Sequence, residues 1–229
     1  MVKHVGIIAV SFEGAALCYR TFCEEAMALA GGLSHPEVSV HNHSLKDYMD
    51  FIENGDWNGV VDLMVSSGKK LAAAGANFAV CPDNTVHQVF EQVAKQSPVP
   101  LLSIIEVVSD ECKRRGYRKV GVLGTKYTMK GPMYKEALAK RMIKMVVPDA
   151  KDKERVNSVI FDELVPEGVT ESSVKVLVDV VQKLKNAGCD AVILGCTELP
   201  LVLNMKNSPL PVVDSTRLLA LKALEHALK

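Results

Sequence analysis

Residues 190–200 read DAVILGCTELP. An aliphatic run closed by a glycine is typical of a buried strand, and the residues that follow are typical of a turn that opens a helix. We therefore expect Cys196 at the carboxyl end of a strand, beside the peptide N–H groups of a helix start. Peptide N–H groups in such a place lower the pKa of a thiol and also bind carboxylates. The pattern indicates a reactive cysteine, and the plainer alternative is an inert buried one.

The composition indicates a soluble globular protein with one large domain or two small ones. The chain has 229 residues, of which 48% are apolar, so a sizeable core is possible. Lys and Arg together number 27, as do Asp and Glu, and this balance argues against nucleic-acid and membrane partners. Residues 1–4 lead straight into a strand pattern and not into a signal peptide, and the six cysteines form no regular framework. We expect a cytoplasmic protein that binds a small molecule.

Apolar runs of strand length alternate with amphipathic segments along the whole chain, which predicts an α/β fold with parallel sheets. The expected strands are residues 5–10, 38–43, 78–81, 101–105, 119–124, 145–147, 190–195 and 211–214. The expected helices are residues 15–30, 57–74, 85–95, 107–115, 135–144, 152–164, 171–186 and 215–229. In the last of these helices, a stripe at helical spacing is expected to face the core: Leu218, Leu221, Leu224 and Leu228.

Two pairs of similar segments indicate an internal duplication. Residues 5–8 and 120–123 are both short aliphatic runs with a glycine in second place, 115 positions apart. Residues 77–85 resemble residues 190–198 at an offset of 113. Two features repeated at nearly the same offset predict two pseudo-symmetric domains, each a mostly parallel sheet flanked by helices.

We expect the first domain to span residues 1–115, completed by the C-terminal helix 215–229, and the second to span residues 116–214. Ligands bind at the carboxyl ends of the strands in such sheets. The duplication makes Asp83 the counterpart of Cys196, and a two-fold relation would make the two residues face each other across a cleft. The active site is expected in that cleft.

Two opposed proton-transfer groups suit the removal of a proton next to a carboxylate from one face and its return on the other. The enolate-like charge that develops needs fixed hydrogen-bond donors, and Asn84, Thr85 and Thr197 are suitable. Motifs of the CxxC, HExxH and glycine-rich P-loop types are absent from the sequence, so it suggests neither a metal site nor a phosphate cradle.

The chain resembles the aspartate/glutamate racemases, within the superfamily that includes hydantoin racemases. The segments that carry this resemblance are residues 6–8 (GII), 11–15 (SFEGA), 82–87 (PDNTVH), 124–129 (GTKYTM), 147–149 (VPD), 163–164 (EL) and 194–198 (LGCTE). The resemblance implies a two-base racemase that needs no cofactor, neither pyridoxal phosphate nor metal. It also implies a pseudo-symmetric two-domain architecture and a homodimer.

The sequence departs from the family pattern at the first catalytic segment. That segment usually reads Cys-Asn-Thr, and here Asp83 precedes Asn84 and Thr85. Cys81 lies two residues earlier, on the same side of the strand but deeper. The resemblance therefore assigns one acid/base to Cys196 and the second to Asp83, with Cys81 as the alternative. A carboxylate with an ordinary pKa near 3.9 is a weak base unless burial raises it.

Six polar residues at the strand ends are predicted to bind the substrate: Ser11, Asn84, Thr85, Thr125, Thr128 and Thr197. Asn84, Thr85, Thr128 and Thr197 could instead cap their helices, and the same holds for Asp83. Ser11 and Thr125 occupy matching turns after the first strand of each half, which favours contact with an anion. His87 is expected to be structural or solvated. Lys46 or Arg20 could bind a distal carboxylate. The basic run 113–115 is expected to be a solvated helix end.

The leading hypothesis is a racemase of a small acidic amino acid, aspartate or glutamate. One alternative is an isomerase or decarboxylase of small dicarboxylates that uses the single cysteine. Another is a catalytically silent protein that binds dicarboxylates. The sequence leaves the side chain of the substrate and the preferred enantiomer open.

Overall fold

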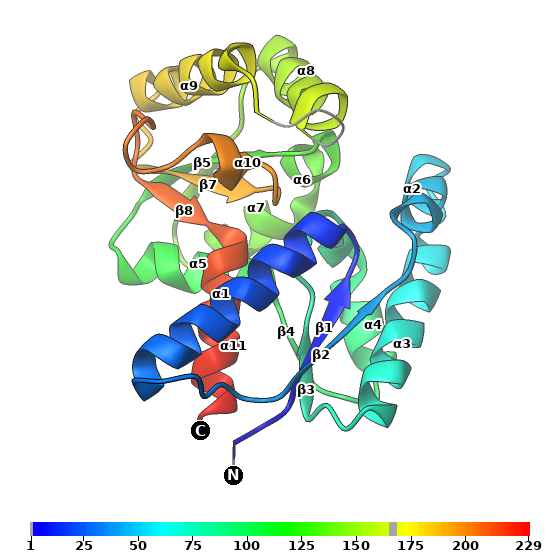
Figure 1. The fold of residues 1–229 in the computed structure, drawn as a ribbon. Helices are drawn as coiled ribbons and strands as arrows, with labels where there is room; N and C mark the ends of the chain where they lie inside the picture. The colour runs from blue at the N-terminus through cyan, green and yellow to red at the C-terminus, as the bar shows by residue number, and fades with distance from the viewer. Residues whose placement is uncertain (1, 165–168) are drawn as a thin grey trace. The chain divides into compact units, whose positions relative to one another are not determined.

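The computed structural model describes residues 2–164 and 169–229 and divides the chain into two compact units (Figure 1). One unit runs to Val107 and takes in Thr216–Lys229, and the other is Val108–Ser215. Within the described residues, no helix is both long and apolar enough to cross a membrane.

The first unit contains a four-stranded parallel sheet in the order β2-β1-β3-β4. Its strands are β1 (Val5–Ala9), β2 (Val38–Asn42), β3 (Phe78–Val80) and β4 (Leu101–Leu102). Every residue of β1 and β3 is buried, as expected for parallel strands covered on both faces.

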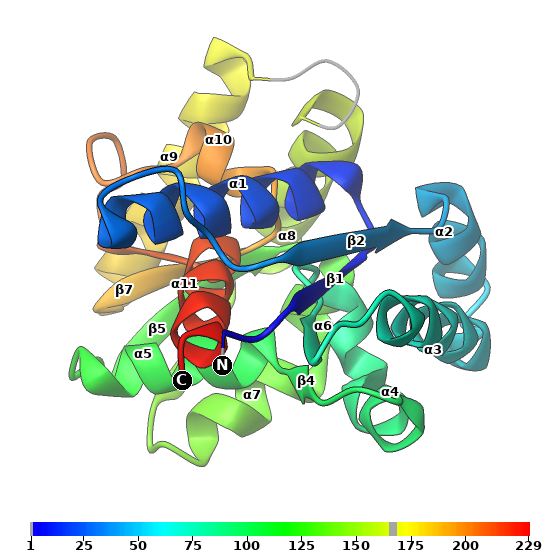
Figure 2. The ribbon, with the colours of Figure 1, turned by 60° about the horizontal axis from the view of Figure 1, so that its bottom comes forward.

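Helices cover both faces of this sheet. They are α1 (Phe12–Ala30), α2 (Leu45–Glu53), α3 (Trp57–Ala73), the 3₁₀-helix η1 (Thr85–Val89), α4 (Phe90–Gln96) and α11 (Ser215–Ala227). Figures 1 and 2 show α1 and α11 on one side of the sheet and α3 and α4 on the other. This division follows from right-handed crossovers, because the connection from β1 to β2 and the connection from β2 to β3 run in opposite directions across the sheet.

The second unit repeats this plan, with a parallel sheet in the order β6-β5-β7-β8. Its strands are β5 (Lys119–Gly124), β6 (Lys144–Val146), β7 (Ala191–Gly195) and β8 (Val212–Asp214). Its helices are α6 (Lys126–Lys130), α7 (Pro132–Ala139), α8 (Ala150–Ser158), the π-helix η2 (Val159–Leu164), α9 (Glu171–Asn186) and α10 (Leu199–Val202). Helix α5 (Ile104–Arg114) follows β4 and leads into this unit.

The two sheets have the same strand order, with β5 in the place of β1 and β7 in the place of β3. All described strand pairs are parallel. The predicted duplicated α/β fold is therefore confirmed. The stretch at 190–200 forms the fully buried strand β7, as its apolar pattern predicts.

The predicted leucine stripe of the last helix is correct only in part, because Leu224 is buried but two other members are not. Leu221 and Leu228 are 41% and 52% exposed. The buried face of α11 is made mostly of small residues instead: Leu219, Ala220, Ala223, Leu224 and Ala227. The ring of His226 on this helix contacts Phe78 of β3 at a centroid distance of 4.6 Å.

Several helices differ from the prediction. Helix α2 was not predicted, although Ser44 caps its start and Tyr48 and Ile52 form a buried pair at helical spacing. The helix predicted at 135–144 ends five residues earlier, and Met142 takes a left-handed φ of 61° before β6 begins. The helix predicted at 152–164 consists of α8 followed by the π-helix η2.

Candidate active site

In each unit the carboxyl ends of two neighbouring strands carry the predicted site residues. The chain leaves β1 in one direction along the sheet and leaves β3 in the other, so the ends of β1 and β3 form the topological switch point where α/β sheets bind ligands. Ser11 follows β1 and Asp83 follows β3. Thr125 follows β5 and Cys196 follows β7 in the same way.

Ser11 and Thr125 have matching roles as helix caps. The Ser11 hydroxyl oxygen accepts a hydrogen bond from the Gly14 N–H at 3.1 Å at the start of α1. The Thr125 hydroxyl oxygen accepts one from the Thr128 N–H at 3.3 Å at the start of α6. Both hydroxyls lie at the carboxyl ends of central strands. Substrate contact by either residue stays a prediction.

Asp83 caps the turn after β3. Its half-buried carboxylate accepts a hydrogen bond from the Val86 N–H at 3.1 Å through Oδ1. Asp83 therefore has the capping role that the sequence allows, and it fills this role through one carboxylate oxygen. Asn84 and Thr85, which follow, are both buried in the first unit.

Cys81 is almost completely buried on the same segment. Burial, and after it the charge of Asp83, raises the pKa of the Cys81 thiol well above its ordinary value. A carboxylate near a buried thiol disfavours the thiolate. Cys81 is therefore held as a neutral thiol, which is a poor base at physiological pH.

In the second unit a pair of glycines brings the ends of β5 and β7 close together. Gly124 and Gly195 are partners in the parallel ladder. A Cβ atom on Gly124 would lie 2.7 Å from the main-chain oxygen of Gly195, and one on Gly195 would lie 3.0 Å from Cγ2 of Thr128. The absence of side chains at both positions lets the fully buried Thr128 pack against the two strand ends. This packing, together with the hydrogen bond from its N–H to Thr125, gives Thr128 a structural role. Substrate contact by its side chain stays a prediction.

Cys196 is half-buried directly after β7, and its thiol donates a hydrogen bond to Oε2 of Glu198 at 2.8 Å. The Glu198 side chain is itself buried, with the residue 5% exposed. A carboxylate that accepts a hydrogen bond from a thiol is placed to take its proton. The motif Cys-Thr-Glu contains both residues, but sequence reasoning missed the contact because only the turn after β7 brings them together. Thr197, between them, is also buried.

The turn after Cys196 opens a helix, as predicted, but that helix is only four residues long. In the turn, the Leu199 N–H donates to the Cys196 carbonyl oxygen at 3.3 Å, and the helix that follows is α10. One helical turn has only a small dipole. The expected effect of a helix start on the thiol is therefore weaker than the pattern indicates, and Glu198 is the stronger local influence.

The two predicted cations are on exposed helix surfaces and are already in ion pairs. Lys46 contacts Asp50 at 2.5 Å, and Arg20 contacts Glu24 at 3.8 Å. Exposed pairs of this kind contribute little to stability and exchange partners readily.

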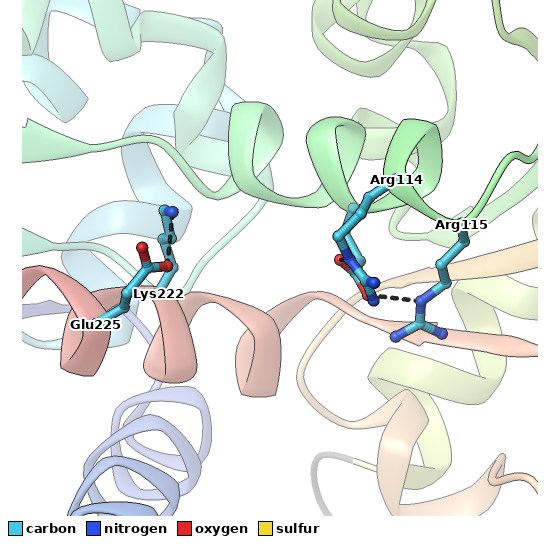
Figure 3. A network of polar contacts seen from close by, with 5 residues as sticks. Arg114, Arg115, Lys222 and Glu225 are labelled. Carbon is cyan, nitrogen blue, oxygen red and sulfur yellow. Dashed lines mark hydrogen bonds and ion pairs between the residues drawn. The ribbon is translucent and has the colours of Figure 1, made fainter.

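The basic run 113–115 is an exposed helix end, as predicted, and two of its residues form ion pairs within the helix. Arg114 and Arg115 both bind the carboxylate of Glu111, at 2.5 and 2.6 Å, and these contacts lower the pKa of Glu111 to about 2. Figure 3 shows the two arginine side chains, together with the separate pair formed by Lys222 and Glu225 at 2.7 Å on α11.

The remaining cysteines are buried and free. Burial raises the pKa of Cys18 and of Cys112 to about 12, and it raises the pKa values of Cys23 and Cys189 as well. Within residues 2–164 and 169–229, His, Cys, Asp and Glu side chains form no group of three or more that could hold a metal ion. Cys196 is therefore the cysteine whose surroundings best suit proton transfer.

The family described as Asp/Glu/hydantoin racemase matches residues 5–223. The chain belongs to the Asp/Glu/hydantoin racemase family. Racemases are isomerases, so membership places the chain among the isomerases.

Solved structures agree with this membership. A Yersinia pestis protein provisionally described as an Asp/Glu racemase has 31% sequence identity and a TM-score of 0.91, and the match covers 99% of this chain and 100% of that one. An aspartate racemase homologue from Pyrococcus horikoshii OT3 has 32% identity and a TM-score of 0.86, with both chains covered completely. Among curated proteins, the broad specificity amino-acid racemase RacX of Bacillus subtilis (strain 168) is 24% identical over 199 residues, which are 87% of this chain and 85% of that protein.

Proposed function

We propose that this protein is a racemase of a small acidic amino acid, aspartate or glutamate, and that it works without pyridoxal phosphate or metal. One observation carries the proposal. Cys196 and Asp83 lie just after equivalent strands, β7 and β3, in two sheets with the same strand order. Family membership supports the reaction class, and the acidic substrates follow from the descriptions of the relatives.

The proposed reaction moves one proton away from Cα and returns another to the opposite face. In one direction the Asp83 carboxylate removes the proton while the Cys196 thiol donates its own. The electron pair left on Cα is delocalised into the substrate carboxylate, where the strand-end donors stabilise the developing charge. In the other direction the Cys196 thiolate removes the proton and protonated Asp83 supplies one.

Glu198 has a defined part in this scheme. The thiol of Cys196 hydrogen-bonds to its carboxylate at 2.8 Å. Transfer of the thiol proton to Glu198 produces the thiolate that the second direction requires, and return of the proton restores the thiol. Glu198 thus acts through Cys196 as a positioning residue.

We assign the second base to Asp83 and not to Cys81. The raised pKa of the buried Cys81 keeps its thiol neutral, whereas Asp83 is only half-buried. Substrate contacts are proposed for the strand-end residues: Ser11, Asn84, Thr85, Thr125, Thr128 and Thr197. We further propose a cytoplasmic homodimer, which sedimentation at several protein concentrations tests for oligomeric state.

The test is loss of optical rotation with L- and D-aspartate and L- and D-glutamate, for the wild-type protein and for Cys196→Ala and Asp83→Asn. Asparagine keeps the oxygen that accepts the Val86 N–H but cannot act as a base. We expect racemisation by the wild-type protein only. Wild-type rates in Cys196→Ala would contradict the assignment of the cysteine, and no turnover of any acidic amino acid by the wild-type protein would contradict the function.

A second candidate function is favoured by the difference between the two candidate groups, the Cys196 thiol and the Asp83 carboxylate. Asp83 already caps a turn, so Cys196 could serve alone as a nucleophile or proton donor beside a carboxylate. The corresponding reaction is isomerisation or decarboxylation of a maleate- or malonate-like acid. Product analysis with a panel of dicarboxylates separates it from racemisation. If no acid is turned over but some bind in a thermal-shift titration, the protein is a silent dicarboxylate-binding protein.

A further inference from the structure

His87 is a buried imidazole next to the candidate base, and both of its ring nitrogens contact main-chain atoms. The residue lies in η1 and is 4% exposed. Its Nδ1 is 2.7 Å from the carbonyl oxygen of Asp83, and its Nε2 is 3.2 Å from the main-chain nitrogen of Ile104. The ring also stacks on Phe90, with centroids 4.9 Å apart and planes at 7°.

These contacts fix the tautomer of the ring. The Ile104 N–H can only donate, so Nε2 carries the lone pair, and the ring proton is on Nδ1, which donates to the Asp83 carbonyl oxygen. Burial lowers the pKa of His87 to about 4, although the hydrogen bond to Asp83 opposes this effect. The imidazole is therefore neutral, with one donor and one acceptor, both in use.

The two main-chain partners of the ring belong to the ends of neighbouring strands. Asp83 follows β3, and Ile104 is the first residue of α5, just after β4. The strands β3 and β4 are paired in the sheet, with Ala79 opposite Leu101. The ring is thus a planar bridge between the turn that holds Asp83 and the start of α5.

Asp83 is held at two points as a result. Its side chain accepts the Val86 N–H, and its main-chain carbonyl accepts the His87 Nδ1–H. Together these contacts restrain the backbone and the side-chain torsion that direct the carboxylate. Direction matters for a base, because a misplacement of about 1 Å can lower a rate about a hundredfold.

We propose that His87 is a positioning residue for Asp83: its neutral Nδ1–H tautomer holds the Asp83 main chain so that the carboxylate keeps its reactive orientation. The inference rests on the proposed racemase function with Asp83 as second base. The imidazole exchanges no proton with the substrate and acts only through Asp83.

Two substitutions separate the two contacts of the ring. His87→Asn places an amide N–H near the position of Nδ1, so the donor to the Asp83 carbonyl is kept and the contact with Ile104 is lost. His87→Gln reaches the position of Nε2, so its amide oxygen accepts the Ile104 N–H and the contact with Asp83 is lost. The variants are matched in polarity and differ in which contact survives.

The experiment measures kcat and KM for both enantiomers of aspartate and of glutamate, in the wild-type and the Asp83→Asn backgrounds, with circular dichroism to establish the folded fraction. We expect His87→Gln to lower kcat about ten- to a hundredfold with KM changed less than about twofold. We expect His87→Asn to stay within about threefold of the wild-type kcat. In the Asp83→Asn background neither variant should change the residual rate of Cα exchange.

Equal kcat values for the two variants per folded molecule, or a further loss in the Asp83→Asn background, would overturn the positioning role. A wild-type kcat for His87→Gln beside an inactive Asp83→Asn would overturn this inference alone. A wild-type kcat for Asp83→Asn would overturn the proposed role of Asp83 and this inference with it. The nitrogen chemical shifts of the wild-type imidazole give a check without any variant: we expect protonated Nδ1 between about pH 5 and pH 8, and an Nε2–H tautomer would contradict the bridge.

Discussion

The hydrogen bonds of Cys196 and Asp83 suit different protonation states of the two side chains. The thiol donates to Glu198, and the carboxylate accepts from the Val86 N–H. In the proposed reaction, these protonation states suit the direction in which Asp83 removes the proton and Cys196 supplies one. The reverse direction first needs a proton on Asp83, so we expect the two enantiomers of the substrate to react at unequal rates.

Asp83→Asn and Asp83→Ala separate catalysis from capping. Both variants lose the base, so both should lose racemase activity. Only alanine loses the acceptor for the Val86 N–H, and loss of such a cap costs about 1 kcal/mol of the free energy of unfolding. Urea unfolding followed by circular dichroism should show asparagine near the wild-type stability and alanine below it. Equal stability of the two variants would show that the carboxylate does not act as a cap in solution.

Glu198→Gln tests the thiol contact. Glutamine keeps an oxygen that accepts the Cys196 hydrogen bond but cannot take the proton. We expect a rate about ten- to a hundredfold lower in the direction that needs the thiolate, and a smaller change in the other direction. Wild-type rates in both directions would rule out Glu198 as the proton acceptor.

The burial of His87 predicts a pH dependence of stability. Its pKa is about 4 in the folded state, against about 6.5 in an unfolded chain. Between these values the unfolded state binds more protons, so stability falls as pH decreases from 6.5 to 4 and changes little from this cause above 6.5. The expected loss between about pH 7.5 and pH 5 is about 2 kcal/mol. Urea unfolding should show a weaker pH dependence in His87→Asn than in the wild-type protein, and equal slopes would contradict the buried neutral ring.

The strands β5 and β7 position the second unit's candidate residues through close main-chain contact. Gly124 and Gly195 are opposite each other, and the next residues along the two strands are Thr125 and Cys196. Short strands ending at the same level therefore place the hydroxyl and the thiol on neighbouring turns. The glycines are needed because main-chain and Thr128 atoms occupy the space where their side chains would be.

Gly124→Ala should destabilise the second unit. The added Cβ would lie 2.7 Å from the main-chain oxygen of Gly195, which cannot move without disturbing the strand pair. Overpacking of this kind costs about 1–3 kcal/mol. Gly32→Ala is the matched control, because nothing lies within 4 Å of a Cβ at that position. Thermal unfolding should show a lower midpoint for Gly124→Ala only, and equal midpoints would contradict the close contact.

In the whole molecule, the features that could be predicted from the sequence are those that depend on local pattern and repetition. Buried strands, their parallel pairing and the duplication follow from apolar runs and equal offsets, and the repeat also matched Asp83 with Cys196. The contact between Cys196 and Glu198 depends on the shape of one turn, which no periodicity encodes. The buried face of α11 was predicted only in part, because three of its residues are alanines, which a stripe of leucines at helical spacing leaves out. The same limit applies to His87, whose partners are main-chain atoms of residues 83 and 104.

The central claim is that two different groups, one from each duplicated sheet, exchange protons with opposite faces of Cα. The most direct measurement is the initial position of solvent deuterium during turnover of a single enantiomer of aspartate or glutamate in D₂O. Two bases predict deuterium at Cα of the product enantiomer before it appears in the recovered substrate, with no deuterated product enantiomer formed by Cys196→Ala. Deuterium that appears equally in substrate and product from the start, or a deuterated product enantiomer formed by Cys196→Ala, would contradict the account.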